Sequence, residues 1–408
     1  MEDQSAIVLD VGSDNTKAGM SHNFPAELEP RVITPSELLV DGAAAGSSGG
    51  NSGAAHSNGG TSHTEGAKGQ RLHPVVRGEI VDGDGFEALV HSCLYNQLGW
   101  ELGAEGCIVM TEPVLTSRSR REWVTRLMFE VFNVAGLFFV DSASASLYAV
   151  GKTSGCVVDI GHGKVDVSTV LEGQLLSSST RRLPYGGQDL TTLMEGMIKG
   201  RPGGPPPNAH TLDYAALKEQ CAHAAENAME LERARLLASA QAGTSSSTGG
   251  DPSAAARPGT EPVTYTLPDG QEVTVRNEGL QVAEALFRPE LLGQAGCPSV
   301  QAAVVSSTST SYEGRAERPG LENILLCGGG SCIGNVGARL LSEVRALALP
   351  SLKPGLCTLP TYFPKSAAAY ASWVGGAVMT KALLNQSQFI SKWDYEEEGP
   401  VAGYRKCA

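Results

Sequence analysis

Residues 6–12 read AIVLDVG and residues 156–161 read CVVDIG, so an apolar strand followed by Asp-x-Gly occurs twice in the chain. Asp10 and Asp159 take equivalent places in the two copies. Glycine lets the turn after such a strand bring its N–H groups close to phosphate oxygens, and an aspartate at the strand end can hold a hydrated divalent cation. The repeat therefore predicts a duplicated phosphate-binding fold around a central cleft.

A third glycine turn, at residues 327–331 (CGGGS), follows the apolar run at residues 323–326. One glycine turn is a weak signal of phosphate binding, because glycines serve many other turns. Three of them after apolar strands favour a nucleotide cleft.

Length and composition fit a large folded protein. The 408 residues suffice for two or three domains or for one two-lobed domain, and 41% hydrophobic residues with 18% charged ones are typical of globular proteins. The formal net charge of -13 argues against direct nucleic-acid binding, since neutralising phosphates needs clustered Lys and Arg.

The nine cysteines indicate a reducing compartment, because they are odd in number and include no C-x-x-C pair. The N-terminus lacks the basic start of a secretory signal, and no apolar run approaches the ~20 residues of a membrane span. We therefore expect a soluble intracellular protein with no membrane partner.

Four segments have the composition of flexible insertions, being rich in Gly, Ala, Ser and Pro with few large apolar residues. They are residues 41–70, 200–209, 241–262 and 306–320. Between them, strand-like and helix-like patterns alternate, which favours an α/β fold.

One-faced apolar patterns predict helices over residues 86–97 and 123–131, the second with Thr116 and Ser117 as N-cap candidates. A long helix is expected over residues 212–240. A hairpin is expected at residues 265–275, around the turn Pro-Asp-Gly at 268–270.

Several of these stretches resemble the actin family. They include residues 7–20 (IVLDVGSDNTKAGM), 159–167 (DIGHGKVDV) and 390–407 (ISKWDYEEEGPVAGYRKC). The last stretch is specific to actins, since sugar kinases and chaperone ATPases share the glycine loops but not this tail. The resemblance covers nearly everything outside the four insertions.

The resemblance implies the actin-like ATPase fold, an α/β architecture of two duplicated ribonuclease-H-like lobes around a nucleotide cleft. It places residues 1–190 in the first lobe, with the insertion 41–70. Residues 191–408 form the second lobe, with the insertions 200–209, 241–262 and 306–320, and include a C-terminal segment that returns to the first lobe.

The resemblance also implies a site for ATP with Mg²⁺. Asp10 and Asp159 would hold the metal through water, Ser13 and Lys17 would contact the phosphates, and Lys218 and Glu219 would lie beside the ribose and adenine. The remaining cofactor-binding residues are those of the glycine turns: Gly12, Gly161, His162, Gly163, Gly328 and Gly329. A solvated strand residue is the competing interpretation of Lys17, and an exposed helix face that of Lys218 and Glu219.

Four positions depart from the family pattern. Ser142 replaces a water-positioning glutamine, His162 replaces an aspartate, Asp14 replaces a glycine, and Ala369 replaces a lysine near adenine. All four changes indicate weak nucleotide binding with little or no hydrolysis. We assign no catalytic residue, because His162 has no nucleophile and no carboxylate orienter nearby in sequence.

The amino-acid sequences of residues 98–109, 115–136 and 147–167 most resemble those of a plant class of nuclear actin-related proteins, which are subunits of chromatin-remodelling assemblies. The resemblance implies a non-polymerising scaffold subunit in the nucleus, with a cytoplasmic pool left open. Its partners would be a helix of the remodelling ATPase, docked near residues 123–132 and Tyr148, and other actin-related proteins.

No filament is expected, because the insertion 41–70 replaces the outer loop through which actin subunits join. The alternative function is a hydrolysing actin-like ATPase of the cytoskeleton or of cytoplasmic transport. A small-molecule kinase would share the fold, but the C-terminal stretch argues against it. Arg118, Arg120 and Arg121 are interpreted as the solvated face of a helix rather than as a nuclear import signal.

Overall fold

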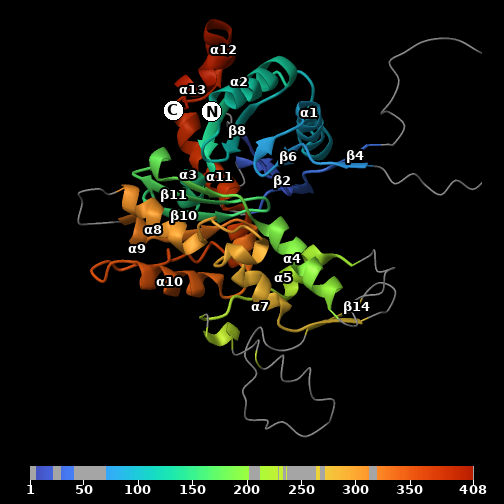
Figure 1. Cartoon of the computed structure of the whole chain (residues 1–408). Helices are drawn as coiled ribbons and strands as arrows, with labels where there is room; N and C mark the ends of the chain where they lie inside the picture. Colours follow the sequence, from blue (N-terminus) through green and yellow to red (C-terminus); the bar gives the residue numbers. More distant parts are fainter. Residues whose placement is uncertain are drawn as a thin grey trace, which may run out of the picture.

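The structure is a computed structural model that describes residues 6–21, 29–40, 70–201, 212–227, 229–232, 236, 263–266, 272–311 and 319–407. Two mixed sheets with helices around them form an upper and a lower lobe in Figure 1, with α3 and α11 between them. This arrangement confirms the predicted α/β class.

The first sheet has the strand order β17-β9-β8-β1-β2-β3. β1 is antiparallel to β2 and parallel to β8, which is parallel to β9. The strands are β1 (Ala6–Val11), β2 (Asn15–Met20), β3 (Val32–Pro35), β8 (Cys107–Glu112), β9 (Gly136–Asp141) and β17 (Ile390–Ser391).

The second sheet has the order β12-β11-β10-β16, with β13 also paired to β11. β10 is antiparallel to β11 and parallel to β16. The strands are β10 (Gly155–Ile160), β11 (Val165–Leu171), β12 (Gln174–Leu175), β13 (Arg181–Leu183) and β16 (Ile324–Cys327). The two sheets therefore share one plan, a hairpin whose first strand has a parallel neighbour.

The register makes the duplication explicit. Asp10 lies opposite Lys17 across the first hairpin, and Asp159 lies opposite Asp166 across the second. On its parallel side Asp10 is paired with Thr111, as Asp159 is with Cys327. The same two strand ends thus carry a carboxylate–ammonium pair in one lobe and a carboxylate–carboxylate pair in the other.

Three short antiparallel pairs lie outside the two main sheets: β4 (Leu38–Val40) with β5 (Gln70–Leu72), β6 (Val75–Val76) with β7 (Glu79–Ile80), and β14 (Val263–Thr266) with β15 (Glu272–Val275). The last pair confirms the hairpin predicted from the sequence, although its turn lies outside the described residues.

Helices of the first lobe confirm the two apolar patterns. α1 (Gly83–His91) continues into η2 (Ser92–Gln97), and α2 (Arg118–Arg126) continues into η3 (Leu127–Val131). The Ser117 side chain accepts a hydrogen bond from the Arg120 N–H, as expected of an N-cap, whereas Thr116 donates to the Pro113 carbonyl instead.

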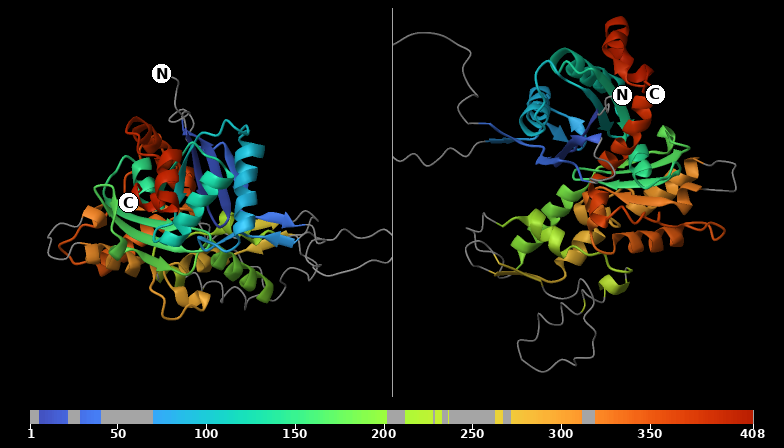
Figure 2. Two further views of the ribbon diagram at one scale, coloured as in Figure 1. Left: turned by 90° about the horizontal axis from the view of Figure 1, so that it is seen from above. Right: turned by 180° about the vertical axis from the view of Figure 1, so that it is seen from behind.

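The remaining helices of the first lobe lie near the C-terminus, beside α2 in Figures 1 and 2. They are α12 (Lys392–Glu398), η8 (Gly399–Val401) and α13 (Ala402–Arg405). Since β17 pairs with β9, this last segment is joined to the first sheet.

The second lobe has its helices around β10–β13 and β16. These helices are α4 (Gly187–Gly200), α5 (Tyr214–Cys221), α7 (Glu278–Glu284), α8 (Val300–Ser311), α9 (Pro319–Glu322) and α10 (Val336–Leu347). Short 3-10 helices complete the described part of this lobe: η4 (Ser177–Ser179), η5 (Pro289–Leu292), η6 (Gly329–Cys332) and η7 (Lys365–Tyr370).

α3 (Ser142–Ala149) and α11 (Ala371–Asn385) cross between the sheets. Their backbones touch, because a Cβ atom at Gly375 would collide with the Ala145 carbonyl. The core around them draws Val8 from the first sheet and Val157 from the second, so one apolar cluster joins the lobes. Separate clusters fill the outer side of each lobe.

The prediction of one long helix over residues 212–240 is wrong. α5 ends at Cys221, and the next residue has an extended backbone. His223 then forms a parallel bridge with Gly334, and the Ala224 N–H donates to the Gly334 carbonyl at 2.7 Å. A tertiary contact with the turn before α10 therefore overrides the helix propensity of this Ala-rich stretch.

The insertion expected at residues 306–320 is also partly wrong. α8 extends to Ser311, and Ser307 and Thr308 within it are buried. The Ser307 hydroxyl lies 3.0 Å from the Thr169 hydroxyl of β11, and the Thr308 hydroxyl donates to the Val304 carbonyl. α9 begins at Pro319. Residues 312–318 lie outside the described residues.

Most of the other insertions lie outside the described residues as well, namely 41–69, 202–209 and 241–262. Their edges are ordered parts of the fold. Gln70 belongs to β5, Gly200 ends α4, and the Arg201 side chain donates to the Thr274 carbonyl and pairs with Glu278.

The division of the chain at residue 190 stays a proposal. Sheet membership changes earlier, between β9 and β10, so residues 155–183 hydrogen-bond with strands of the second sheet. None of the described helices is long and apolar enough to cross a membrane.

Arg120 and Arg121 do not form the solvated face expected of them. Arg120 donates to the Gly78 carbonyl and its side chain is 12% exposed, whereas Arg121 pairs with Glu112 and is 18% exposed. Arg118 lies over the ring of Tyr404, 5.2 Å from its centre. The cluster therefore ties α2 to its neighbours.

Candidate functional site

The two Asp-x-Gly turns have the same backbone geometry. The Gly12 N–H donates to the Asn15 carbonyl at 3.2 Å, and the Gly161 N–H donates to the Lys164 carbonyl at 3.0 Å. A Cβ atom at Gly12 would lie 2.8 Å from the Asn15 oxygen, and one at Gly161 would lie 3.2 Å from the Lys164 oxygen. A side chain at position 12 would therefore force the first turn to shift, and one at position 161 would be tightly packed.

The turns open onto a cavity of about 500 Å³ between the lobes. All of the predicted cofactor-binding residues line it: Asp10, Gly12, Ser13, Lys17, Asp159, Gly161, His162, Gly163, Lys218, Glu219, Gly328 and Gly329. A volume of this size is ordinary for a small-molecule site. The structure thus brings together residues that lie up to 319 positions apart in the sequence.

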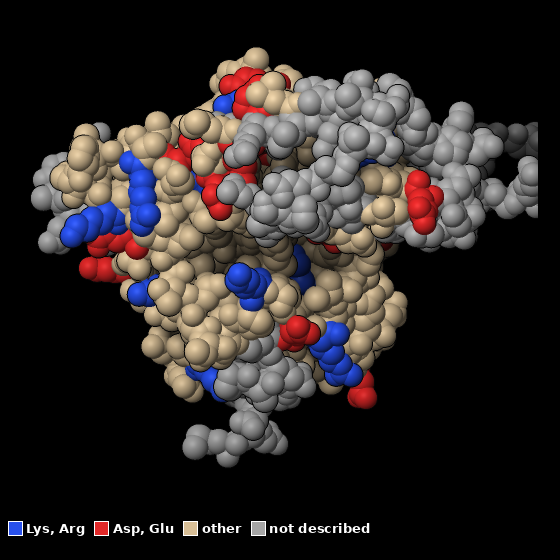
Figure 3. Space-filling view, turned by 90° about the horizontal axis from the view of Figure 1, so that it is seen from below, with Lys and Arg blue, Asp and Glu red and all other residues tan. Residues whose placement is uncertain are grey.

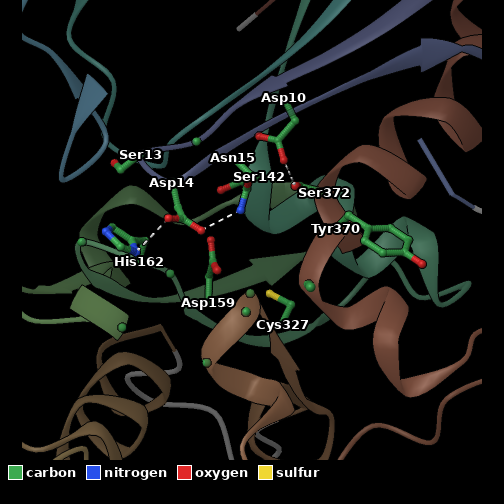
Figure 4. A pocket seen from close by; sticks show the side chains of 18 of the residues that line it. Asp10, Ser13, Asp14, Asn15, Ser142, Asp159, His162, Cys327, Tyr370 and Ser372 are labelled. Atoms are coloured by element: carbon green, nitrogen blue, oxygen red, sulfur yellow. Dashed lines mark hydrogen bonds and ion pairs between the residues drawn. The ribbon is translucent and has the colours of Figure 1, made fainter. Parts of the chain in front are cut away.

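Asp10 is held by three partners at the end of β1. The Thr111 hydroxyl donates to one carboxylate oxygen at 2.8 Å, the Ser372 hydroxyl donates to the other at 2.9 Å, and the Lys17 ammonium lies 3.4 Å away. A carboxylate has about four lone-pair sites, so water can still bind to it. Figure 4 shows the contact with Ser372.

Asp159 has a different setting at the end of β10. Burial, followed by the neighbouring Asp166 charge, raises the pKa of Asp159 to about 6, against the opposing effect of Lys164. Lys164 and Arg182 are both paired with Asp166, so they do not pair directly with Asp159. A bound cation would compensate this buried carboxylate.

A pair of side chains joins the two turns at the phosphate end. An oxygen of Asp14 lies 3.4 Å from Nδ1 of His162, and the Asn15 side-chain amide donates to the other Asp14 oxygen at 2.6 Å. Figure 4 shows Asp14 between these two partners. Burial lowers the pKa of His162, while the charge of Asp14 acts against that change.

Ser142 begins α3 at the cavity wall, where the family resemblance places a glutamine. The preceding Asp141 caps the helix by accepting a hydrogen bond from the Ser144 N–H at 2.8 Å. Burial raises the pKa of Asp141. The Ser142 side chain is short, so it cannot project as far into the cavity as an amide would.

Lys218 and Glu219 lie on α5 at the second-lobe wall. The Lys218 ammonium donates to the Gly187 carbonyl at 3.0 Å and to the Thr191 hydroxyl at 2.9 Å, and burial lowers its pKa. Lys218 is therefore not on an exposed helix face; its contacts fix α5 against α4.

The third glycine turn forms the floor beside Asp159. Gly328 has φ +79°, and a Cβ atom there would collide with the Asp159 carboxylate and the Ile160 carbonyl. Gly330 packs equally closely against Ile160. These contacts explain the glycines at positions 328 and 330, whereas a Cβ atom at Gly329 would meet nothing within 4 Å.

Sequence reasoning missed the lining residues Tyr370, Ser372 and Cys332, and also Thr111, which does not line the cavity but donates to Asp10. The Tyr370 hydroxyl donates to Glu29 at 3.0 Å, and burial followed by Glu29 raises the pKa of Tyr370 to about 12. Ser372 begins the stretch SWVGG at residues 372–376, which also resembles the actin family, and this resemblance was the available signal.

Outside the cavity, Arg77 fastens the lobes together. It follows β6 with φ +49°, and its guanidinium donates to the carbonyls of Gly163 and Pro184 at 2.5 and 2.7 Å. It also pairs with both oxygens of Asp189, at 2.8 and 3.1 Å. Arg182 makes a reciprocal contact by donating to the Val114 carbonyl.

Two sheets of one plan around a cavity lined by glycine turns define the actin-like ATPase fold, with its two ribonuclease-H-like lobes. The chain belongs to the actin family, whose sequence model, described as Actin, matches residues 1–408. Domains of this family generally bind a nucleotide with a divalent metal ion.

Among individual proteins, the chain is 36% identical to Actin-related protein 7 of Oryza sativa subsp. indica and 35% identical to Actin-related protein 7 of Arabidopsis thaliana. Each match covers 98% of this chain and 99% of the relative. It is 27% identical to Actin-like protein 7B of Homo sapiens, over 98% of this chain and 88% of that protein. The resemblance to the actin family, and to its plant actin-related protein 7 class, is confirmed.

The residues present fit a nucleotide in part. The paired turns, Lys17 and the cavity volume suit a polyphosphate, and Asp10 and Asp159 suit a cation bound through water. Within the described part of the chain no group of three or more His, Cys, Asp and Glu residues could enclose a metal directly. The place between the turns fits less well, because Asp14 and His162 meet there.

Proposed function

We propose that this protein is a non-polymerising scaffold subunit of a nuclear chromatin-remodelling complex, which binds ATP with Mg²⁺ weakly and hydrolyses it little or not at all. Membership of the actin family supports the fold and the nucleotide cleft. The similarity to the plant class over residues 98–109, 115–136 and 147–167 supports the nuclear role.

The proposal of little or no hydrolysis depends mainly on two replaced residues, Ser142 and His162, in the wall of the cavity. Ser142 lines the cavity where the family uses an amide to orient water, and Nδ1 of His162 lies 3.4 Å from an Asp14 oxygen. A general base must reach the water it activates; the Ser142 side chain is shorter than an amide, and the His162 side chain already has Asp14 as a partner.

The contacts of Arg77 support the scaffold part. They join the lobes through protein groups alone, and Asp14 and His162 add a second link across the cleft. A subunit whose lobes are linked in this way does not need nucleotide turnover to present a constant surface to partners.

Surface charge supports protein partners over nucleic acid. On the face seen from below in Figure 3, the Lys and Arg side chains of the described residues are scattered among uncharged and acidic ones and form no continuous basic stripe. The remodelling-ATPase helix and neighbouring actin-related proteins are the proposed partners. The outer loop at residues 41–69, on which the absence of filaments depends, lies outside the described residues.

Affinity purification of the tagged chain from nuclear extract, followed by mass spectrometry, tests the proposal. We expect a remodelling ATPase in stoichiometric amount, and equal recovery with the Asp159→Ala variant, because the scaffold role does not require the metal-side carboxylate. Recovery only as a cytoskeletal polymer would contradict the proposal.

The second candidate is a hydrolysing ATPase of the cytoskeleton or of cytoplasmic transport. It is favoured by the intact arrangement of Asp10, Lys17 and Asp159 around the two turns. If this candidate is correct, affinity purification from nuclear extract would recover no remodelling ATPase, and the purified protein would release phosphate from ATP.

A further inference from the structure

The space between the two glycine turns decides how long a phosphate chain the cavity accepts. Each turn can offer backbone N–H groups to phosphate oxygens, so a group that both turns hold lies between them. In this chain the Asp14 side chain already crosses that space, from the first turn toward His162 of the second.

We propose that the cavity takes a nucleoside diphosphate in preference to a triphosphate, because the Asp14 carboxylate occupies the place of a terminal phosphate. This inference rests on the proposed nucleotide binding and goes beyond it by naming the ligand class. The carboxylate resembles a terminal phosphate in carrying negative charge and two acceptor oxygens, so it can use the same donors.

The partners of Asp14 show how its position is maintained. Nδ1 of His162 lies 3.4 Å from one carboxylate oxygen, and the Asn15 amide donates to the other at 2.6 Å. One partner comes from each lobe. A terminal phosphate entering between the turns would have to displace the carboxylate from both.

The charges around this place oppose a further anion. Asp159 is half-buried nearby, and the cationic side chains around it are engaged elsewhere: Lys164 and Arg182 with Asp166, and Lys17 with Asp10. Lys218, the remaining cation near Asp14, donates to the Gly187 carbonyl and the Thr191 hydroxyl. A diphosphate is shorter by one phosphate and carries less charge, so it can bind without displacing the Asp14 carboxylate. Like charges held a few ångströms apart in a partly buried site repel each other strongly.

Asp14 has two other possible roles, and each changes the expected result. Its side chain is 55% exposed, so it could turn to solvent when a triphosphate arrives. Alternatively it could ligate Mg²⁺, in place of the carboxylate that the family carries at position 162. The first role removes any selectivity, and the second makes Asp14 favourable to ATP.

Isothermal titration calorimetry of ADP and of ATP into the purified full chain tests the proposal. The protein is first stripped of nucleotide, and each titration is done with Mg²⁺ and again with EDTA. We expect ADP to bind about tenfold or more tightly than ATP. In Asp14→Gly the ATP affinity rises by about tenfold while the ADP affinity stays nearly constant. The exposed Asp84 of α1 provides a matched control, Asp84→Asn, that leaves the ratio unchanged.

Equal or tighter binding of ATP by the unaltered chain overturns the proposal, as does a ratio that Asp14→Gly leaves unchanged. Loss of Mg²⁺-dependent ATP binding in Asp14→Asn also overturns it, because Asp14 would then be a metal ligand. Absence of binding by either nucleotide to every folded variant, with folding checked by circular dichroism, overturns it too. That last outcome leaves the scaffold role intact, which only the purification experiment tests.

Discussion

Ser142 and His162 are the residues at which the chain departs from a hydrolysing site. Both line the cavity, one at the start of α3 and one in the second glycine turn. The second glycine turn closes with the same hydrogen bond as the first, and Ser142 is held at the cavity wall by α3, so exchange of side chains alone should restore part of the missing chemistry.

At this scale we predict that Ser142→Gln combined with His162→Asp raises phosphate release from ATP about tenfold above the unaltered chain. The amide would orient water, and the new carboxylate would return an acceptor to the metal side. Stopped-flow detection of phosphate measures the rate. Ser142→Ala is the control and should stay at the background, whereas a double variant that also stays there would contradict the assigned roles.

The crossing of α3 and α11 is the tightest contact between elements, because Gly375 lies against the Ala145 carbonyl. We predict that Gly375→Ala lowers the free energy of unfolding by about 3 kcal/mol, since the added methyl forces two helix backbones apart. Urea denaturation measures the change.

The exposed helical glycine of α4, Gly196, has open space around its Cβ position and supplies the control. Gly196→Ala should raise the free energy of unfolding by about 0.5–1 kcal/mol through helix propensity. If the two substitutions changed the free energy of unfolding equally, the backbones of α3 and α11 would not be in close contact.

The C-terminal helix α12 depends on a capping box. The Asp394 carboxylate accepts from the Ser391 N–H at 2.7 Å and from the Lys406 ammonium at 2.7 Å. Although burial acts to raise it, contacts with Lys406 and Ser391 lower the pKa of Asp394 to about 2. The unfolded chain therefore takes up the proton first as pH falls.

The stabilising effect of Asp394 is consequently complete above about pH 4 and is lost between about pH 4 and pH 2. We predict that Asp394→Asn lowers the free energy of unfolding by about 1 kcal/mol at pH 7 and has a smaller effect at pH 3. Urea midpoints at the two pH values check this. Glu396→Gln, exposed on the same helix, should change neither value.

At the level of elements, local patterns predicted what local physics determines. The strand before each Asp-x-Gly turn, the helices α1 and α2, the Ser117 cap and the β14–β15 hairpin all follow from periodicity and turn chemistry. The end of α5 did not, because a contact with Gly334, over a hundred residues away, decides it. Ser307 and Thr308 of α8, which are buried, were misread for the same reason.

The residues of the candidate site likewise fall into those that the sequence predicted and those that it did not. Aspartates and glycines in repeated turns were recognisable, and all of them line the cavity. Thr111 and Arg77 were not recognisable, since each acts across a long sequence separation through hydrogen bonds or an ion pair. Composition and spacing contain no signal for such contacts.

For the whole molecule, Arg77 is the main link between the lobes outside the cavity. We predict that Arg77→Met lowers the free energy of unfolding by about 2 kcal/mol and speeds amide exchange around Gly163, because three acceptors lose their donor. Hydrogen exchange with mass spectrometry follows the lobes separately.

Arg71 is the matched control, because its pair with Glu37 is at the surface and its side chain is 68% exposed. Arg71→Met should change stability by less than about 0.5 kcal/mol. Unaltered exchange in Arg77→Met would mean that the central apolar core alone holds the lobes together.

The central claim is that the paired turns retain the form of a nucleotide site without its turnover. Steady-state phosphate release by the purified chain at saturating Mg-ATP tests this claim most directly, with Asp159→Ala measured in parallel. We predict that both proteins release phosphate at the same background rate. Release by the unaltered chain that collapses in Asp159→Ala would contradict the account and would establish a working ATPase.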